Sequence, residues 1–311
     1  MIKPRVAITA RSFDLKGPAF SQLHEKTDIC YINKTGHRLD SSELQKAIVT
    51  VHAAVAGTEQ FSRDIIESSK SLKIISRIGV GTDSIDLDTA RKNGIRILTT
   101  PEAPAQSVAE HTIGLIFAVL KRIPEYNTNI RRNDWSVRPA LLLSGKNAGI
   151  IGMGRIGKKV ASMLSALGCK IRYYDPFVSD RKGIIGTRCE LLEGLLRGSD
   201  IITLHTPPLP NNRPLLDERL FESCKKGCII INTSRGSLLA EDGLLHALDS
   251  GRVSAAALDV FWNEPYHGPL LLRPEVIMTP HVASNTLESR WQMEKEAVEN
   301  IFRAMQEGKS I

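Results

Sequence analysis

The sequence predicts an α/β protein with two doubly wound parallel sheets, in which the second domain is inserted into a smaller first one. The 311 residues are too many for one average domain and suggest two. Short β-branched runs alternate with amphipathic segments along most of the chain. This alternation breaks at residues 100–104, which contain Pro101 and Pro104, and restarts at Asn147.

The first hundred residues predict a small, flavodoxin-like domain. Their strands and amphipathic segments follow one another as in a parallel sheet with crossover helices. Predicted strands span residues 6–9, 28–31, 53–56, 74–77 and 95–98, and the helices between them include 41–50 and 62–69.

A long helix at residues 106–122 leads into the second domain. Predicted strands follow at 148–151, 170–174, 201–204, 228–232, 255–258 and 276–278, and helices at 155–167, 191–197, 218–224 and 242–250. Six strands with intervening helices predict a complete Rossmann sheet. The amphipathic segment 285–306 then has only the first domain to pack on. We therefore expect one domain at 1–100 and 285–311, another at 101–284, and the active site in the cleft between them.

A glycine motif marks the start of the second domain. Gly152, Gly154 and Gly157 form G-x-G-x-x-G between a predicted strand and helix, and Asp175 ends the next strand. In a dinucleotide site these glycines permit a tight turn, backbone approach to a pyrophosphate and close helix packing. An acid at Asp175 binds the ribose hydroxyls and repels a ribose phosphate, which favours NAD over NADP. The alternative is an ordinary turn followed by a surface aspartate, and the flanking strand and helix argue against it.

Composition excludes several other classes of function. The formal net charge is +7, but the basic residues are scattered, and the one dense cluster, at 131–132 with Arg138 nearby, lacks an aromatic ladder. We therefore expect no nucleic-acid partner. No stretch is long and apolar enough to span a bilayer, and the N-terminus lacks the apolar core of a signal peptide. Five cysteines without regular spacing are typical of a reducing cytoplasm, and Cys224 and Cys228 are interpreted as core thiols rather than metal ligands.

Three predicted strands end in side chains suited to catalysis. Arg235 follows the strand at 228–232, Asp259 and Glu264 follow the strand at 255–258, and His281 follows the strand at 276–278. Each residue alone could be an ordinary loop residue. Ligands of open α/β sheets bind beyond the carboxyl ends of the strands, so three such residues together indicate an active site.

Hydride transfer to a 2-oxo acid fits this set of side chains. The carbonyl oxygen gains negative charge as the hydride arrives, so an acid must donate a proton, and histidine suits reversible work near neutrality. Glu264 beside His281 would stabilise the imidazolium. Arg235 would clamp the carboxylate and polarise the carbonyl, while Asp259 would reach a nicotinamide carboxamide.

The chain resembles the D-isomer-specific 2-hydroxyacid dehydrogenase family over nearly its whole length. The resemblance rests on segments 78–86, 152–157, 232–236, 259–265 and 279–284. It implies catalysis by Arg235, Glu264 and His281, and substrate contacts in the smaller domain, including the backbone of Val80 and Gly81. It further implies a homodimer built through segment 104–140, with Trp135 in the arm that reaches the partner. The implied cofactor contacts, beyond the three glycines, are Arg155, Ile156, Asp175, Thr206, Thr233, Asp259 and Ser284.

Two departures from the family pattern bear on function. Ala56 stands where the phosphoglycerate branch tends to carry an arginine, although Arg77 and Arg138 are similar to its other phosphate contacts. Segment 210–214 lacks the threonines often found in a cofactor loop.

We expect an NAD-dependent reductase of glyoxylate or hydroxypyruvate, with D-3-phosphoglycerate dehydrogenase as the alternative. A non-catalytic, corepressor-like NAD(H) sensor is the alternative of another class. No regulatory domain is expected after Ile311.

Overall fold

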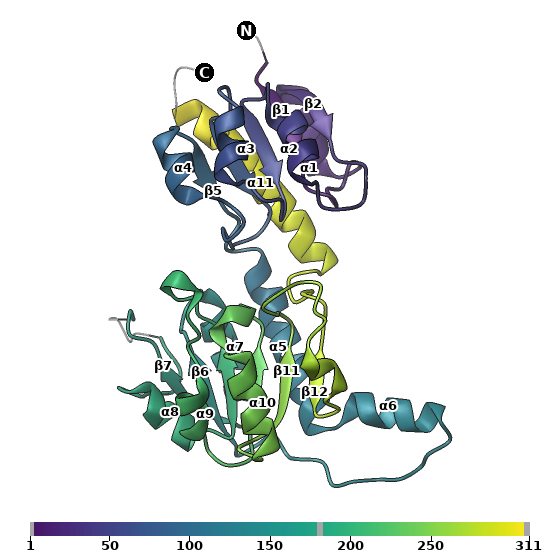
Figure 1. The fold of residues 1–311 in the computed structure, drawn as a ribbon, viewed down its shortest axis with the longest axis vertical. Helices are drawn as coiled ribbons and strands as arrows, with labels where there is room; N and C mark the ends of the chain where they lie inside the picture. Colours follow the sequence, from purple (N-terminus) through teal and green to yellow (C-terminus); the bar gives the residue numbers. More distant parts are fainter. Residues whose placement is uncertain (1–2, 179–182, 308–311) are drawn as a thin grey trace. The chain divides into compact units, whose positions relative to one another are not determined.

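The structure is a computed structural model that describes residues 3–178 and 183–307. The chain divides into two compact units, Met1–Pro104 with Asn285–Ile311 and Ala105–Ser284 (Figure 1). Each unit is built on one parallel sheet with helices, so the predicted α/β fold class is confirmed.

The first unit contains a five-stranded sheet in the order β2-β1-β3-β4-β5, which is the flavodoxin order. Val6 and Ile8 lie on the face covered by α1 and α11, and Ala7 lies on the opposite face. The C-terminal helix therefore packs on the first sheet. The strands are β1 (Arg5–Ile8), β2 (Asp28–Ile32), β3 (Ala53–Ala56), β4 (Ile74–Arg77) and β5 (Arg96–Leu98). The helices are α1 (Pro18–Lys26), α2 (Ser41–Ile48), α3 (Arg63–Ser68), α4 (Leu87–Lys92) and α11 (Leu287–Glu307).

The second unit contains a seven-stranded sheet in the order β12-β11-β10-β9-β6-β7-β8. Numbered from β6, this is the dinucleotide-binding order 3-2-1-4-5-6 with one further strand beside the sixth. The strands are β6 (Asn147–Ile151), β7 (Lys170–Tyr174), β8 (Thr187–Arg188), β9 (Ile201–Leu204), β10 (Cys228–Asn232), β11 (Val253–Leu258) and β12 (Val276–Met278). The α-helices are α5 (Pro104–Leu120), α6 (Ile123–Arg131), α7 (Arg155–Ala166), α8 (Leu192–Gly198), α9 (Glu218–Glu222) and α10 (Glu241–Asp249). The 3-10 helices are η1 (Pro210–Asn212), η2 (Gly236–Leu238) and η3 (Pro269–Leu272).

The sequence prediction of six strands was wrong by one. The missed strand, β8, spans only Thr187–Arg188, and a strand of this length has no visible alternation. The helix predicted at 218–224 ends at Glu222, because Ser223 and Cys224 turn back to bond the carbonyls of Leu220 and Phe221.

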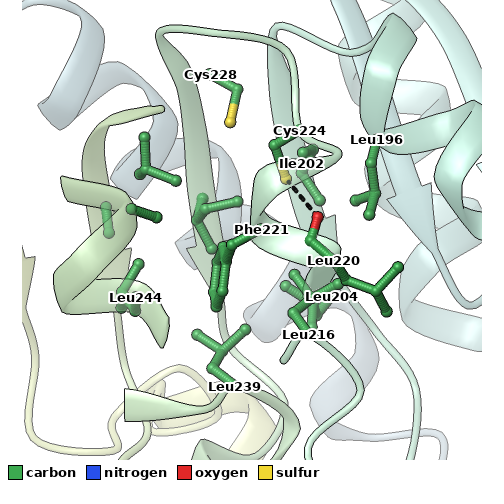
Figure 2. Close-up of a cluster of buried hydrophobic side chains, with 14 of the residues drawn as sticks. Leu196, Ile202, Leu204, Leu216, Leu220, Phe221, Cys224, Cys228, Leu239 and Leu244 are labelled. Atoms are coloured by element: carbon green, nitrogen blue, oxygen red, sulfur yellow. Dashed lines mark hydrogen bonds between the residues drawn. The ribbon is translucent and has the colours of Figure 1, made fainter. Parts of the chain in front are cut away.

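Alternate residues of the central strands fill the two faces of the second sheet. Ile202 and Ile230 belong to one buried cluster, whereas Ile201 and Ile229 belong to the other. Figure 2 shows the first cluster, in which Phe221 lies among leucines and the Cys224 thiol donates to the Leu220 carbonyl. Cys224 and Cys228 are buried and unpaired, as expected for core thiols.

Residues 3–178 and 183–307 contain no helix long and apolar enough to cross a membrane. Within the same ranges, no group of three or more histidine, cysteine, aspartate or glutamate side chains is arranged to hold a metal ion.

Candidate active site

The glycine motif forms the turn between β6 and α7. Gly152 has φ +93°, and a Cβ there would lie 2.5 Å from the carbonyl oxygen of His205. A Cβ on Gly157 would overlap the Gly152 carbonyl, so the helix approaches the strand too closely for any side chain. A Cβ on Gly154 would meet open space, and no side chain caps the helix that starts at Arg155. The turn therefore leaves N–H groups and room for an anionic group, as a dinucleotide pyrophosphate requires.

Asp175 is fixed beside this turn. Its Oδ2 accepts from the Met153 N–H at 2.8 Å, and its Oδ1 accepts from the Phe177 N–H at 2.9 Å. Each carboxylate oxygen retains a further lone pair. The acid at the end of β7 is thus held against the glycine turn and still has acceptor capacity for hydroxyl donors.

A histidine and a glutamate pair at the carboxyl edge of the same sheet. The Nδ1 of His281 lies 2.8 Å from Oε2 of Glu264, and each side chain is partly exposed, at 45% and 39%. Oε1 of Glu264 accepts from the Phe261 N–H at 3.1 Å. Partial burial would raise the pKa of Glu264, but the hydrogen bond from His281 and its positive charge outweigh burial and lower the pKa below its usual value. With Nδ1 engaged by the carboxylate, Nε2 is the nitrogen left to meet a substrate.

Asp259 organises the turn that carries His281. The Asp259 side chain is fully buried, and its Oδ1 accepts from the Thr279 hydroxyl at 2.5 Å and from the Val282 N–H at 2.9 Å. Its Oδ2 accepts from the Ala283 N–H at 2.9 Å. His281, with φ +53°, is in the left-handed region, and its own N–H donates to the Asp259 carbonyl at 2.8 Å.

Asp259 also has a partner that the sequence did not indicate. Nε2 of His111, on α5, lies 3.5 Å from Asp259 Oδ1 and 3.1 Å from the Thr279 hydroxyl. Burial would raise the pKa of Asp259, but these hydrogen bonds outweigh it and hold the carboxyl below its ordinary value. The sequence predicted that Asp259 would face a nicotinamide. The contacts of its carboxylate described here are all made to protein groups. No local sequence signal could have found His111, because the contact joins segments far apart in the chain.

Arg235 lies directly beyond β10. Its Nη1 donates to the Ser234 carbonyl at 2.7 Å, and its own carbonyl accepts from the Asn232 side-chain amide at 2.8 Å. A Cβ on Gly236 would overlap the Phe261 backbone, so the Arg235 loop lies against the loop that carries Glu264. The structure therefore brings Arg235, Glu264 and His281 to one edge of one sheet.

Two threonines from the expected cofactor set are fixed by hydrogen bonds at this edge. The hydroxyls of Thr233 and Thr112 lie 2.9 Å apart, and the Thr206 carbonyl accepts from the Ser234 hydroxyl at 2.6 Å. Burial lowers the pKa of the neighbouring His205 to about 3, and its Nε2 lies 2.9 Å from the Thr203 hydroxyl. His205 is thus a neutral, structural histidine near neutral pH.

The expected substrate residues of the first unit lie at the end of β4, which is Arg77, and in the loop that follows. Nη1 of Arg77 donates to the Ile78 carbonyl at 2.9 Å, and a Cβ on Gly79 would overlap this guanidinium. Val80 is exposed, and Gly81 follows it in the same loop. The Gly79 N–H donates to the Thr100 hydroxyl at 2.8 Å, which ties the loop to the end of the sheet.

Comparisons with known proteins identify related sequences. A family model described as the D-isomer specific 2-hydroxyacid dehydrogenase, NAD binding domain, matches residues 113–283. The D-3-phosphoglycerate dehydrogenase of Bacillus subtilis is 36% identical over 254 residues, which cover 80% of this chain and 48% of that protein. The hydroxypyruvate reductase of Thermotoga maritima is 37% identical over 279 residues, which cover 87% of this chain and 90% of that protein.

A solved structure resembles the whole chain. The crystal structure of an NADPH-dependent glyoxylate/hydroxypyruvate reductase from Sinorhizobium meliloti matches with a TM-score of 0.86 and 27% identity, covering 98% of this chain and 96% of that one. The chain spans about half the length of the first curated relatives it matches.

Proposed function

Because the chain belongs to the D-isomer specific 2-hydroxyacid dehydrogenase family, we propose that it transfers a hydride reversibly between NADH and C2 of a small 2-oxo acid. The substrate is of the glyoxylate or hydroxypyruvate type, and the product is a D-2-hydroxy acid. One observation carries this proposal: His281 Nδ1 and Glu264 Oε2 lie 2.8 Å apart at the carboxyl edge of the sheet that bears the glycine turn. Such a pair supplies a proton donor whose charged form is stabilised.

The roles of the catalytic residues follow from this pairing. NAD, when bound, supplies or accepts the hydride. His281 donates a proton from Nε2 to the carbonyl oxygen of the substrate as that oxygen becomes an alkoxide. Glu264 stabilises the imidazolium before the proton leaves and holds the ring in place. In the oxidative direction the same histidine takes the proton from the hydroxyl, so it must be neutral at the start.

Arg235 is the proposed clamp for the substrate carboxylate. Its planar guanidinium can hold two carboxylate oxygens at once and polarise the adjacent carbonyl. We assign further substrate contacts to Arg77, at the end of β4, and to the backbone of Val80 and Gly81 in the loop that follows. The hydrogen bond from the Gly79 N–H to the Thr100 hydroxyl holds this loop in place. These assignments orient the acid but do not themselves move protons.

The residues around the glycine turn fit a dinucleotide. Gly154 and the uncapped start of α7 suit the pyrophosphate, and the side chain of Asp175 suits the adenosine ribose. A carboxylate there repels a 2′-phosphate, which supports NADH over NADPH as the preferred cofactor. The proposed set is Gly152, Gly154, Arg155, Ile156, Gly157, Asp175, Thr206, Thr233, Asp259 and Ser284.

Two alternatives differ in substrate or in class. D-3-phosphoglycerate dehydrogenase activity is less favoured, because the end of β3 carries Ala56 and offers no guanidinium for a phosphate. A non-catalytic NAD(H) sensor is less favoured as well, since such a protein has no need of the hydrogen-bonded pair of His281 and Glu264.

We further propose that the protein acts in the cytoplasm as a homodimer. All five cysteines are unpaired thiols, which suits a reducing compartment. In Figure 1, α6 and the segment after it project from the body of the second unit. That segment exposes Trp135, Val137 and Leu142 at 81%, 85% and 69%, an apolar arm that suits a second copy.

A panel of 2-oxo acids with NADH, followed at the nicotinamide absorbance, tests this function. We expect turnover with glyoxylate or hydroxypyruvate, and turnover at least about a hundredfold lower in the variant His281→Ala. Absence of NADH oxidation with every 2-oxo acid of the panel would refute the proposal.

A further inference from the structure

A buried glutamate in the first unit has no role in the chemistry described so far. Glu59 follows β3 by three residues and is 1% exposed. Its Oε2 accepts from the Gly57 N–H at 2.7 Å and from the Thr9 hydroxyl at 3.3 Å. Ionisable carboxyls are almost never fully buried unless they are partnered, so this position calls for an explanation.

Glu59 and Arg77 lie near the same end of the first sheet. Strands β3 and β4 are neighbours, with Ala56 opposite Arg77 and the Ile78 N–H donating to the Ala56 carbonyl at 2.8 Å. Burial raises the pKa of Glu59, and the Gly57 N–H, the Thr9 hydroxyl and the positive charge of Arg77 oppose that rise. The two opposite charges therefore lie near the same end of the sheet.

The orientation of Arg77 follows from its close contacts. Its Nη1 donates to the Ile78 carbonyl at 2.9 Å, and the guanidinium occupies the space that a side chain on Gly79 would need. Arg77 is thus folded against the loop of Val80 and Gly81 and supports that loop. The Gly57 N–H, one residue beyond β3, is already taken by the Glu59 carboxylate.

We propose that Glu59 is a specificity-determining residue, which offsets the charge of Arg77, takes the Gly57 amide and so disfavours substrates with a second anionic group. This inference rests on the proposed function. A phosphate brought to this edge would meet a buried carboxylate of like charge and would find one backbone donor fewer. An uncharged hydroxymethyl group or a hydrogen in the same place would meet neither penalty.

The variant Glu59→Gln removes the charge of the side chain and keeps nearly the same size and shape. Its amide oxygen can still accept from the Gly57 N–H, while the negative charge near Arg77 is removed. The readout is the ratio of kcat/KM for phosphohydroxypyruvate to kcat/KM for hydroxypyruvate, at one fixed ionic strength. We expect this ratio to rise about ten- to hundredfold, because the variant removes one negative charge that repels the dianionic phosphate.

Two further variants serve as controls. Glu67→Gln removes the same charge from α3, where Glu67 and Arg63 form an exposed ion pair, and should leave the ratio within about twofold of the parent. Adding Arg77→Ala to Glu59→Gln should abolish the gain, because the released positive charge is then absent. A purely structural role of Glu59 would lower both kcat/KM values together and leave the ratio unchanged.

The possible outcomes separate the two proposals. An unchanged ratio in Glu59→Gln, with hydroxypyruvate still reduced, overturns the role of Glu59 and leaves the proposed function intact. If this variant does not fold, the parent decides: a parent that prefers phosphohydroxypyruvate overturns the role of Glu59, and one that prefers hydroxypyruvate at least tenfold supports it. A parent that reduces neither acid overturns the proposed function itself.

Discussion

Replacing Asp259 by asparagine tests the part of the site that the sequence analysis did not foresee. The two backbone donors of the His281 turn reach different oxygens of this carboxylate, Val282 at Oδ1 and Ala283 at Oδ2, each at 2.9 Å. Asparagine has a single oxygen, so in either orientation its NH₂ group faces one of these N–H groups. The variant keeps the volume and the burial but cannot satisfy both donors.

The cost of Asp259→Asn can be estimated from these contacts. Losing one hydrogen bond to a charged acceptor costs about 1.5–3 kcal/mol, and leaving the buried N–H unsatisfied adds about 1–3 kcal/mol. We expect a loss of about 2.5–6 kcal/mol in the free energy of unfolding, measured by urea denaturation, or a local opening of the turn of similar size. Because His281 stands on this turn, kcat should fall at least tenfold. Thr279→Val removes one hydroxyl donor to the same carboxylate and should cost about 1.5–3 kcal/mol, less than Asp259→Asn because no N–H is left unsatisfied. Parent-like stability together with parent-like kcat in Asp259→Asn would refute this argument.

The pH dependence of stability gives a second measurement on the same residue. The folded-state pKa of Asp259 is lowered, so its stabilising contribution is present above the unfolded value of about 3.9. This contribution is lost as the pH falls through the lower folded value. In Asp259→Asn the acid side of the stability curve should therefore be flatter than in the parent, and curves of the same shape would count against the hydrogen bonds described here.

Three other variants test the remaining roles. Glu264→Gln removes the negative charge beside His281, so the imidazolium becomes less stable. The loss of reductase activity with rising pH should therefore begin at a lower pH. A pH–rate profile with the same limb as the parent's argues against the pair. Arg235→Lys keeps the charge but loses the planar fork, and kcat/KM should fall at least tenfold; an enzyme as active as the parent would make Arg235 a turn residue only. Asp175→Ala should weaken NADH binding and raise the ratio of kcat/KM for NADPH to kcat/KM for NADH. A parent enzyme that already prefers NADPH contradicts the assigned role.

Buried strands followed by polar residues were the most predictable features of this chain. The isoleucines of β10 and the apolar strand β12 have no polar interruption, and polar residues begin at Asn232 and Thr279, shortly before Arg235 and His281. Because parallel strands end at one edge of a sheet, this pattern alone predicted which side chains the fold would bring together.

Contacts between distant segments were not predictable in the same way. His111 lies on α5 and Asp259 follows β11, and only the completed fold brings them within 3.5 Å. The hydrogen bond between Glu59 and the Gly57 N–H was not predictable for a related reason. The side chain of Glu59 turns back two residues to accept that N–H, and the pattern of apolar and polar residues carries no information about such a turn.

The three proposed catalytic groups stand on loops that brace one another. Strands β10, β11 and β12 are adjacent in the sheet, so Arg235, Glu264 and His281 start from neighbouring positions. The Trp262 side chain, in the Glu264 loop, donates to the Leu239 carbonyl at 2.6 Å, beyond the Arg235 loop. The carboxylate of Asp259 accepts hydrogen bonds from the Val282 and Ala283 N–H groups and so holds the His281 turn in place. Since none of these contacts requires a ligand, the loops are held in place before a substrate arrives, which lowers the ordering cost of reaching a reactive geometry.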